Sequence, residues 1–322
     1  MSELLIAKDI KAYYKTFDGQ EIKAVDGVSI TLNENEVLGI AGESGCGKST
    51  LASVLSLLFR PPLYLKGGEM WLGGVDAFKL TKEELRKNIR GKYISLIPQG
   101  AMNSLNPTRK VKQMIIDVLK EHNPNMTTSE ILDLAKERVE ALSLPPRILE
   151  SYPHQLSGGM KQRAVILIST LLNPKILIAD EPTSALDVSS QKIVIKLLVG
   201  LLEKSIIKSI IFITHELPLL RHFTDRIAVM YAGKIVEIGK AEDIIFNPLH
   251  PYTKALMSTM LVPEPYIKKM KIEGIPGLPP NLKDPPKGCR FYPRCSQATE
   301  DCKFDEPKPK EWDGRLVWCE KA

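Results

Sequence analysis

The amino-acid sequence predicts an α/β domain with a layered, largely parallel sheet, followed by a small loop-rich extension. Up to about residue 245, apolar β-rich runs alternate with stretches of helical periodicity, and several of these runs are apolar on both faces. Beyond about residue 260 prolines become frequent, and they break helices and remove backbone donors. We therefore expect a domain over residues 1–255 and an extension over residues 256–322.

Composition and charge limit the class of protein. The 322 residues are 43% hydrophobic and 25% charged, which is typical of a globular chain. The formal net charge is +6, but the lysines are scattered, so we expect no nucleic-acid partner. The N-terminal segment carries acids where an apolar signal core would continue, so we expect no secretory leader and a cytoplasmic chain. The most apolar stretches, 164–179 and 193–214, are interrupted by charges or proline, so we expect no membrane span.

Three apolar runs are expected to be central strands, namely Val37–Ala41, Ile176–Ala179 and Ile210–Ile213. Both faces of each run are apolar, as in strands that helices cover on both sides. Between residues 101 and 165 the chain is more polar and more helical. Residues 129–142 fit an amphipathic helix that begins at Thr127 or Thr128 as a cap, so we expect an inserted helical subdomain over 101–165.

Residues 42–49 read Gly-Glu-Ser-Gly-Cys-Gly-Lys-Ser and fit the phosphate-binding pattern G-x-x-x-x-G-K-[ST]. An apolar strand precedes the run and a helical pattern follows it, as that pattern requires. The glycines let successive N–H groups point at phosphate oxygens, Lys48 reaches the terminal phosphates, and Ser49 ligates Mg²⁺. The alternative is a glycine turn with a chance lysine.

Two adjacent carboxylates, Asp180 and Glu181, follow the second of the predicted strands. Ligands of such sheets bind at the carboxyl ends of the strands. Asp180 would hold Mg²⁺ through its water shell, and Glu181 could polarise the water that attacks the γ-phosphate. The third strand delivers His215 to the same edge, where a neutral imidazole could hold the γ-phosphate. The alternatives are an ordinary strand end and a structural histidine.

A second helix N-terminus suited to an anion is predicted at residues 156–163, Leu-Ser-Gly-Gly-Met-Lys-Gln-Arg. Ser157 is a natural N-cap for a helix running through Leu172, and Gly158 and Gly159 leave the helix end bare. Since the chain already has one phosphate cradle, the second suggests a site that completes ATP binding across a dimer. The alternative is a plain helix cap.

The order of these motifs, together with Ser184–Asp187, resembles that of the ABC ATPases over residues 4 to about 255. The resemblance implies a P-loop NTPase cassette with a RecA-like core, an antiparallel β-subdomain and an inserted helical subdomain. It also implies Mg²⁺-dependent ATP hydrolysis by two cassettes facing head to tail, with Ser157, Gly158 and Gly159 of one touching the γ-phosphate held by the other.

The same resemblance implies further nucleotide contacts. Gln99 would link the Mg²⁺ site to the helical subdomain, and Asp187 would join the two sites across the interface. Tyr14 resembles the aromatic residue that stacks on adenine, with Tyr13 as the alternative. The phosphate loop would contact ATP through Gly42, Ser44, Gly45, Cys46, Gly47, Lys48, Ser49 and Thr50.

Other segments resemble the dipeptide and oligopeptide importer ATPases, above all Asn-Pro-Leu-His-Pro-Tyr-Thr at 247–253. The resemblance implies a second ABC ATPase subunit, either a copy or a paralogue, two transmembrane permease subunits, and an extracytoplasmic solute-binding protein. The chain would be peripheral on the cytoplasmic face of the membrane, and the solute would be a peptide or a related solute such as an oligosaccharide. The alternatives are a soluble ABC ATPase in DNA repair, translation or iron–sulfur assembly, and a regulatory module without useful hydrolysis.

Four of the five cysteines crowd the last tenth of the chain. Their four thiolates would suffice for an iron–sulfur cluster or a tetrahedral zinc, and a reducing compartment favours metal over disulfides. Family resemblance favours a [4Fe–4S] cluster, whereas the spacing alone does not distinguish the metals, and four reduced thiols are the remaining alternative. The residues are Cys289, Cys295, Cys302 and Cys319.

Overall fold

The structure is a computed structural model that describes residues 2–184, 186–259 and 274–321. Ala185 of the Ser184–Asp187 motif and two prolines of the predicted extension, Pro263 and Pro265, lie outside the described residues. The chain divides into two compact units, Met1–Phe78 with Phe212–Ala322, and Lys79–Ile211.

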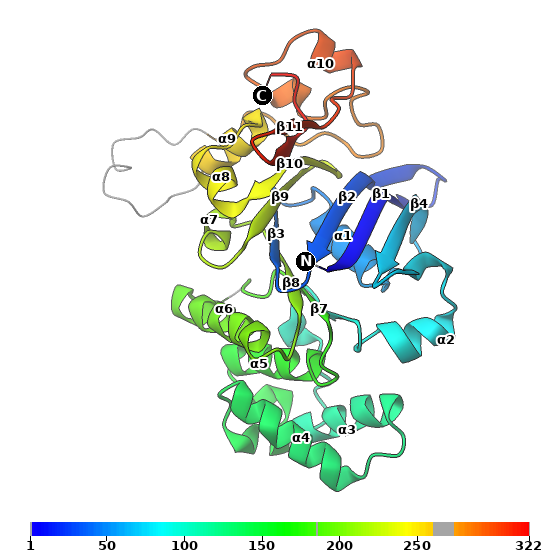
Figure 1. The fold of residues 1–322 in the computed structure, drawn as a ribbon, viewed down its shortest axis with the longest axis vertical. Coiled ribbons are helices and arrows are strands. Elements are labelled where there is room, and N and C mark those ends of the chain that lie inside the picture. The colour runs from blue at the N-terminus through cyan, green and yellow to red at the C-terminus, as the bar shows by residue number, and fades with distance from the viewer. Residues whose placement is uncertain (1, 185, 260–273, 322) are drawn as a thin grey trace. The chain divides into compact units, whose positions relative to one another are not determined.

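The first unit begins with an antiparallel sheet of four strands in the order β2-β1-β4-β5 (Figure 1). Its two long strands carry β-branched and aromatic residues, which favour a pleated surface. The predicted antiparallel β-subdomain is confirmed. The bounds are β1 (Glu3–Lys15), β2 (Glu21–Asn33), β4 (Leu63–Leu72) and β5 (Val75–Asp76).

The parallel part of this unit pairs β3 (Val37–Ala41) with β9 (Arg226–Tyr231). Strand β9 continues antiparallel into β10 (Lys234–Lys240), and β10 pairs with a strand from the end of the chain. That last pairing joins Glu237 to Val317 and Ile238 to Leu316, so the C-terminal extension continues the sheet of the domain. The other elements are α1 (Lys48–Leu55), α7 (Leu217–Leu220), α8 (Ala241–Phe246), α9 (Pro251–Ser258), α10 (Asp301–Phe304), β11 (Lys310–Trp312) and β12 (Arg315–Val317).

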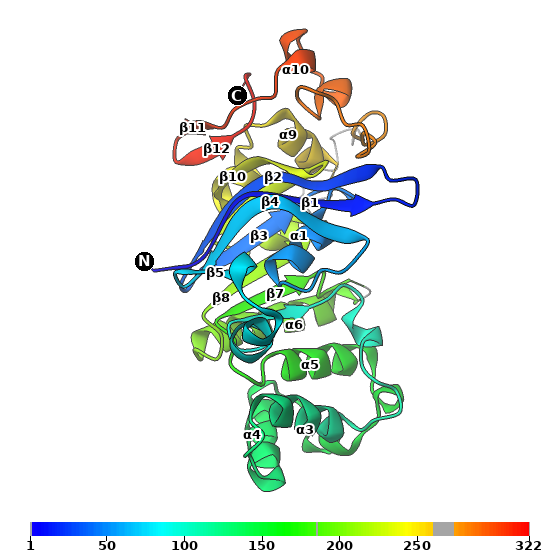
Figure 2. The same cartoon turned by 90° about the vertical axis from the view of Figure 1, so that its right-hand side faces the viewer.

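The second unit contains two parallel strands and a group of helices, in which α3 packs against α4 and α5 (Figure 2). Its bounds are α2 (Lys82–Glu84), β6 (Ile94–Ile97), α3 (Val111–His122), α4 (Thr128–Ala141), α5 (Gly158–Ser169), β7 (Ile176–Asp180) and α6 (Val188–Glu203). Strand β8 (Ser209–Thr214) carries the chain from this unit to the first. The limits 1–255 and 101–165 stay predictions.

The helix caps at Thr127 and Ser157 lie where the sequence predicts them. Thr127 caps α4, where its hydroxyl accepts from Glu130 N–H while the Glu130 carboxylate accepts from Thr127 N–H. The predicted helix after Ser157 is also present, but it ends at Ser169, three residues earlier than predicted. The reason is local: the Thr170 hydroxyl donates to the Ile166 carbonyl at 2.8 Å and Asn173 turns the chain with a φ of 51° before the proline that follows.

The three predicted central strands are confirmed. Every residue of β3, β7 and β8 is buried, which is why both faces of these runs are apolar. Among the described residues, no helix has the length and apolar character needed to cross a bilayer.

Candidate nucleotide-binding site

The phosphate loop, residues 42–49, joins the buried strand β3 to helix α1. Two positions of the loop require glycine because neighbouring backbone lies too close for a side chain. A Cβ at Gly47 would lie 2.0 Å from the Ala24 carbonyl oxygen, and one at Gly42 would lie 2.1 Å from that of Met230. Gly47 also has a φ of 106°, which L side chains rarely adopt. The loop is therefore seated against neighbouring backbone on one side.

Lys48 begins α1 and is almost fully buried, with 5% of its surface exposed. Its ammonium donates to the carbonyl oxygens of Gly42 at 2.7 Å and Glu43 at 3.0 Å, so the positive charge lies inside the curve of the loop. The Cys46 thiol lies 3.8 Å from the same ammonium. Burial raises the pKa of Cys46, although Lys48 acts in the opposite direction, so this thiol is protonated at neutral pH.

The two tyrosines proposed for adenine differ in their surroundings. Tyr13 is buried and donates to the Asp26 carboxylate at 2.6 Å; burial and that hydrogen bond raise the pKa of Tyr13. Tyr14 is only half-buried, and its hydroxyl lies 3.2 Å from that of Thr50, just after the phosphate loop. This arrangement favours Tyr14 over Tyr13, and its stacking on adenine stays a prediction.

In the second unit, strand β7 presents the two predicted carboxylates. Asp180 is the last residue of the strand and is 4% exposed. Glu181 follows in a left-handed conformation with a φ of 48°, and the Gln99 amide donates to its carboxylate at 3.1 Å. Ser184 holds the turn by donating its N–H and hydroxyl to the Glu181 carbonyl at 3.1 and 2.9 Å. The sequence predicted both Gln99 and Glu181 as site residues, but not that they contact each other.

The N-terminus of α5 is open, as predicted. The Ser157 hydroxyl accepts from Met160 N–H at 3.4 Å, and both Ser157 and Gly158 are exposed. A Cβ at Gly159 would meet no atom within 4 Å, and one at Gly158 would meet only the Met102 sulfur at 3.6 Å. The helix end therefore offers accessible N–H groups and its positive dipole end to an anion.

Asp187 caps a helix, and His215 lies just beyond the end of a strand. Asp187 caps α6 by accepting from the N–H groups of Ser189 and Ser190, each at 3.0 Å. Hydrogen bonds from Ser190 lower the pKa of Asp187. His215 follows β8 and is exposed, with its Nε2 4.0 Å from the Glu216 carboxylate. Contacts of Asp187 and His215 with a nucleotide stay predictions.

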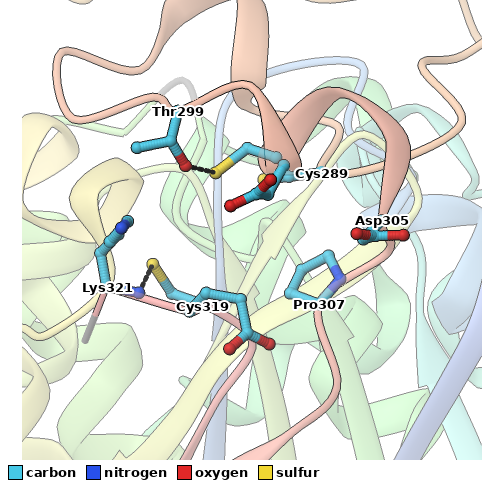
Figure 3. Close-up of a pocket in the computed structure, with 9 residues that line it drawn as sticks. Cys289, Thr299, Asp305, Pro307, Cys319 and Lys321 are labelled. Carbon is cyan, nitrogen blue, oxygen red and sulfur yellow. Dashed lines mark hydrogen bonds between the residues drawn. The ribbon is translucent and has the colours of Figure 1, made fainter.

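The four C-terminal cysteines converge on one place in the first unit. All four line a small cavity of about 20 Å³, and three of them line a wider cavity of about 440 Å³, where acidic side chains also lie (Figure 3). Burial, with the neighbouring thiols, raises the pKa of Cys289 to about 11, and burial raises that of Cys295. The described residues nevertheless hold no group of three or more His, Cys, Asp or Glu side chains placed to bind a metal ion. The described residues therefore show no metal site for the predicted iron–sulfur cluster, which stays a prediction.

The hydrogen bonds that fix the segment 247–253 are not predicted by the sequence analysis. The buried Glu237 carboxylate accepts from the N–H groups of Leu249 at 2.9 Å and His250 at 3.0 Å. His250 in turn caps α9 by accepting from Tyr252 N–H at 3.0 Å, and the Tyr252 hydroxyl accepts from Glu43 N–H at 2.8 Å. A signal was available, because an acid within an otherwise apolar strand requires a partner.

A strand that ends in a glycine loop, with a buried lysine opening the next helix, defines a P-loop nucleotide-binding protein. Comparison with known proteins narrows this class. Residues 25–184 match the model of the ABC transporter family, and residues 236–302 match that of the oligopeptide/dipeptide transporter C-terminal region. The chain therefore belongs to the ABC transporter family, as an ATP-binding subunit of the dipeptide/oligopeptide transporter branch, and it is an ATPase.

Individual relatives are similar to this protein over almost the whole chain. The chain is 42% identical to the dipeptide transport ATP-binding protein DppD of Caldanaerobacter subterraneus, covering 98% of this chain and 95% of the relative. It is also 42% identical to the oligopeptide transport ATP-binding protein OppD of Bacillus subtilis, covering 98% and 88%. Among solved structures, the dimeric ATP-binding cassette MJ0796 bound to ADP and Pi matches with a TM-score of 0.65 and 28% identity, covering 74% of this chain and 98% of that one.

Proposed function

We propose that this chain powers the import of dipeptides, oligopeptides or related solutes by binding and hydrolysing Mg²⁺–ATP. The observation that carries the proposal is the phosphate loop joined, in one unit, to the segment that matches the oligopeptide/dipeptide transporter region. The names of the relatives, which are peptide transport ATP-binding proteins, support the peptide as solute.

The roles of the residues follow from their chemistry. Lys48 and the loop N–H groups bind the phosphates, because they concentrate positive charge at the start of α1. Ser49, Gln99 and Asp180 carry oxygen atoms of the kind that Mg²⁺ prefers, so these residues would hold the ion, which would supply positive charge against the phosphates. Glu181 accepts a proton from the attacking water while the Gln99 amide holds its carboxylate.

The partners follow from the exposed end of α5. An exposed helix N-terminus suits an anion such as the γ-phosphate held by a second ABC ATPase subunit, facing head to tail. The similar cassette MJ0796 is dimeric in its post-hydrolysis state, which supports this arrangement. Two transmembrane permeases and an extracytoplasmic solute-binding protein complete the transporter, and this chain lies on the cytoplasmic face of the membrane.

Gentle isolation of the chain from membranes of its native cell, with mass spectrometry of what remains bound, tests this function. We expect two polytopic permeases and an ATPase subunit, and a solute-binding protein that binds peptides when it is screened. Recovery of soluble partners alone would contradict the transport role and favour a soluble ABC ATPase.

For the four cysteines we propose a [4Fe–4S] cluster, with zinc as the alternative. The support is chemical: four thiols line one cavity, and thiolates are the ligands of both groups. The test is iron, sulfide and zinc analysis after anaerobic purification, with Cys302→Ser beside Cys46→Ser as a control outside the cavity. Loss of metal in the first variant alone supports the proposal, and absence of all three elements from the unsubstituted chain would contradict it.

A further inference from the structure

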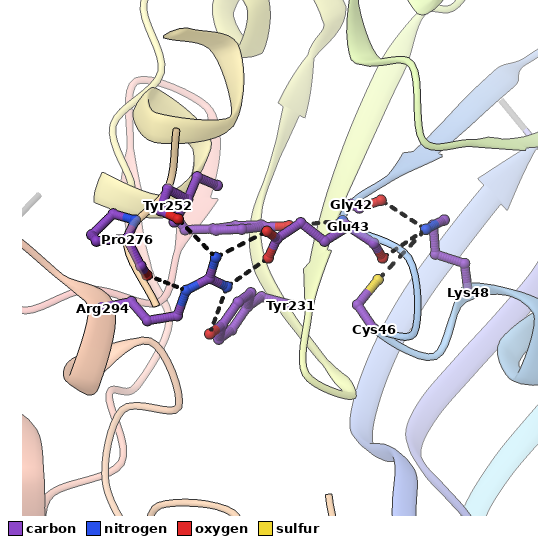
Figure 4. A network of polar contacts seen from close by, with 9 residues as sticks. Gly42, Glu43, Cys46, Lys48, Tyr231, Tyr252, Pro276 and Arg294 are labelled. Atoms are coloured by element: carbon purple, nitrogen blue, oxygen red, sulfur yellow. Dashed lines mark hydrogen bonds and ion pairs between the residues drawn. The ribbon is translucent and has the colours of Figure 1, made fainter. Parts of the chain in front are cut away.

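A buried arginine of the C-terminal extension contacts the phosphate loop directly (Figure 4). The Arg294 guanidinium donates to both oxygens of the Glu43 carboxylate, at 2.7 and 3.0 Å. Its Nε donates to the Pro276 carbonyl at 2.8 Å, and its Nη1 donates to the Tyr231 hydroxyl at 3.3 Å. Only 4% of the Arg294 side chain and 25% of the Glu43 side chain are exposed. The hydrogen bonds to Glu43 also raise the pKa of Arg294, so the guanidinium keeps its positive charge.

The carboxylate, the N–H and the carbonyl of Glu43 all form hydrogen bonds. Its carboxylate is fixed by Arg294, its N–H donates to the Tyr252 hydroxyl at 2.8 Å, and its carbonyl accepts from the Lys48 ammonium at 3.0 Å. Cys46 N–H donates to the same carbonyl at 3.3 Å. Because Glu43 is the second residue of the loop, these contacts leave little freedom to the peptide units that must point at phosphate oxygens.

Other contacts also attach the extension to the rest of its unit. Strand β12 already pairs with β10, and Arg315 donates to the Asn247 carbonyl at 2.7 Å. A second arginine, Arg290, also lies next to a cysteine of the extension, Cys289. Arg290 donates to the Asp26 carboxylate and to the Ala232 carbonyl, not to the phosphate loop. Arg290 and Arg294 are thus chemically matched anchors, and Arg294 is the one whose carboxylate partner belongs to the loop.

We propose that Arg294 is a positioning residue for the phosphate loop, through which the C-terminal extension sets the affinity of residues 42–49 for nucleotide phosphates. A loop already held in its binding conformation loses less conformational freedom when a ligand binds, so it binds more tightly. The inference rests on the proposed nucleotide site at these residues and adds a determinant from outside the motif.

The test compares full-length chains carrying Arg294→Lys, Glu43→Gln, both of these together, or the matched control Arg290→Lys. Lysine keeps the charge but loses the two-pronged donor, so it weakens the pairing without leaving an uncompensated buried carboxylate. The measurements are the Kd for Mg²⁺–ADP by calorimetry, KM and kcat for ATP, and the midpoint of thermal unfolding.

We expect Arg294→Lys to raise the Kd and KM by about fivefold to tenfold and to change kcat by less than about twofold. Glu43→Gln should do the same, and the double variant should be no worse than the worse single one, because both remove one interaction. Arg290→Lys should lower the unfolding midpoint but change the Kd by less than about twofold.

Equal Kd values for Arg294→Lys, Arg290→Lys and the unsubstituted chain would overturn the inference and leave Arg294 as an anchor only. If Arg294→Lys does not fold, the Kd of Glu43→Asp decides, since aspartate keeps the charge beside Arg294 but is one methylene too short for the same two-pronged contact. Failure of the unsubstituted chain to bind Mg²⁺–ADP would instead overturn the nucleotide site itself, so the two failures are distinguishable.

Discussion

The side-chain amide of Gln99 donates a hydrogen bond of 3.1 Å to the carboxylate of Glu181. Glu181 itself sits in a left-handed conformation just beyond the end of β7, with its carbonyl held by Ser184. A residue in that conformation persists only where its surroundings hold it, which points to a fixed direction for the carboxylate.

Gln99→Ala should lower ATP turnover by about tenfold, a larger change than the rise in the Kd for Mg²⁺–ADP that follows from losing one proposed Mg²⁺ ligand of three. The reason is that the alanine variant keeps the Glu181 carboxylate but no longer orients it. The measurement is kcat beside the Kd for Mg²⁺–ADP. An unchanged kcat would show that the amide does not orient the Glu181 carboxylate for hydrolysis.

Ser157→Asp should separate the capping role of this position from its predicted role at a phosphate. Aspartate caps a helix as well as serine does, so unfolding stability should be retained, whereas Ser157→Ala should cost about 1 kcal/mol. The added carboxylate should repel the γ-phosphate and abolish ATP-driven dimerisation. Light scattering with Mg²⁺–ATP checks this in a Glu181→Gln background. A dimer that forms as readily as with serine would refute the role of Ser157 across the interface.

His250→Asn should make the stability of the chain less sensitive to acid. His250 is 1% exposed, and burial lowers its pKa to about 3, partly offset by a hydrogen bond to the Trp318 backbone and reinforced by Lys254. Between that value and the ordinary 6.5, the unfolded chain binds a proton that the folded chain does not, so stability falls as pH drops below 6.5. From pH 7.5 to 5.0 the loss from this group is about 2 kcal/mol.

Asparagine does not titrate, and its side-chain oxygen can accept from Tyr252 N–H as the imidazole does. Denaturant unfolding of both chains at pH 7.5 and 5.0 gives the comparison. Parallel losses of stability in the two chains would rule out His250 as a source of acid sensitivity.

Gly47→Ala and Gly45→Ala should differ in their cost to folding. Both glycines have positive φ, at 106° and 79°, but a Cβ at Gly47 would collide with the Ala24 carbonyl at 2.0 Å, whereas one at Gly45 would meet nothing within 4 Å. We expect a loss of about 3 kcal/mol or more for the first and about 1 kcal/mol for the second. Similar unfolding midpoints for the two variants would show that the loop backbone can shift away from Ala24.

Local patterns predicted much of this molecule because their causes are local. The phosphate loop is predicted by its glycines, which must accept a positive φ or close backbone contact. The helix starts at Thr127 and Ser157 are predicted by hydroxyls that can accept from helix N–H groups. The predicted end of α5 at Leu172 is wrong because apolar periodicity continues to that residue, whereas Thr170 ends the helix through its own side chain.

Contacts between distant residues left no such pattern. Arg294 and Glu43 are 251 residues apart, and each reads alone as an ordinary charged residue. The pairing of β10 with β12 was hidden for the same reason, since three-residue strands show no periodicity. The spacing of the four cysteines predicts that they lie together, and they line one cavity, but spacing determines neither the side-chain directions nor a ligand geometry.

The proposed hydrolysis depends above all on Glu181 as the group that activates the attacking water. The most direct test is Mg²⁺-dependent phosphate release by the unsubstituted chain and by Glu181→Gln, with the Kd for ATP measured on both. We predict that the variant binds ATP with an unchanged Kd and turns over about 10² to 10⁴ times more slowly. Equal turnover in the two chains would contradict this role of Glu181.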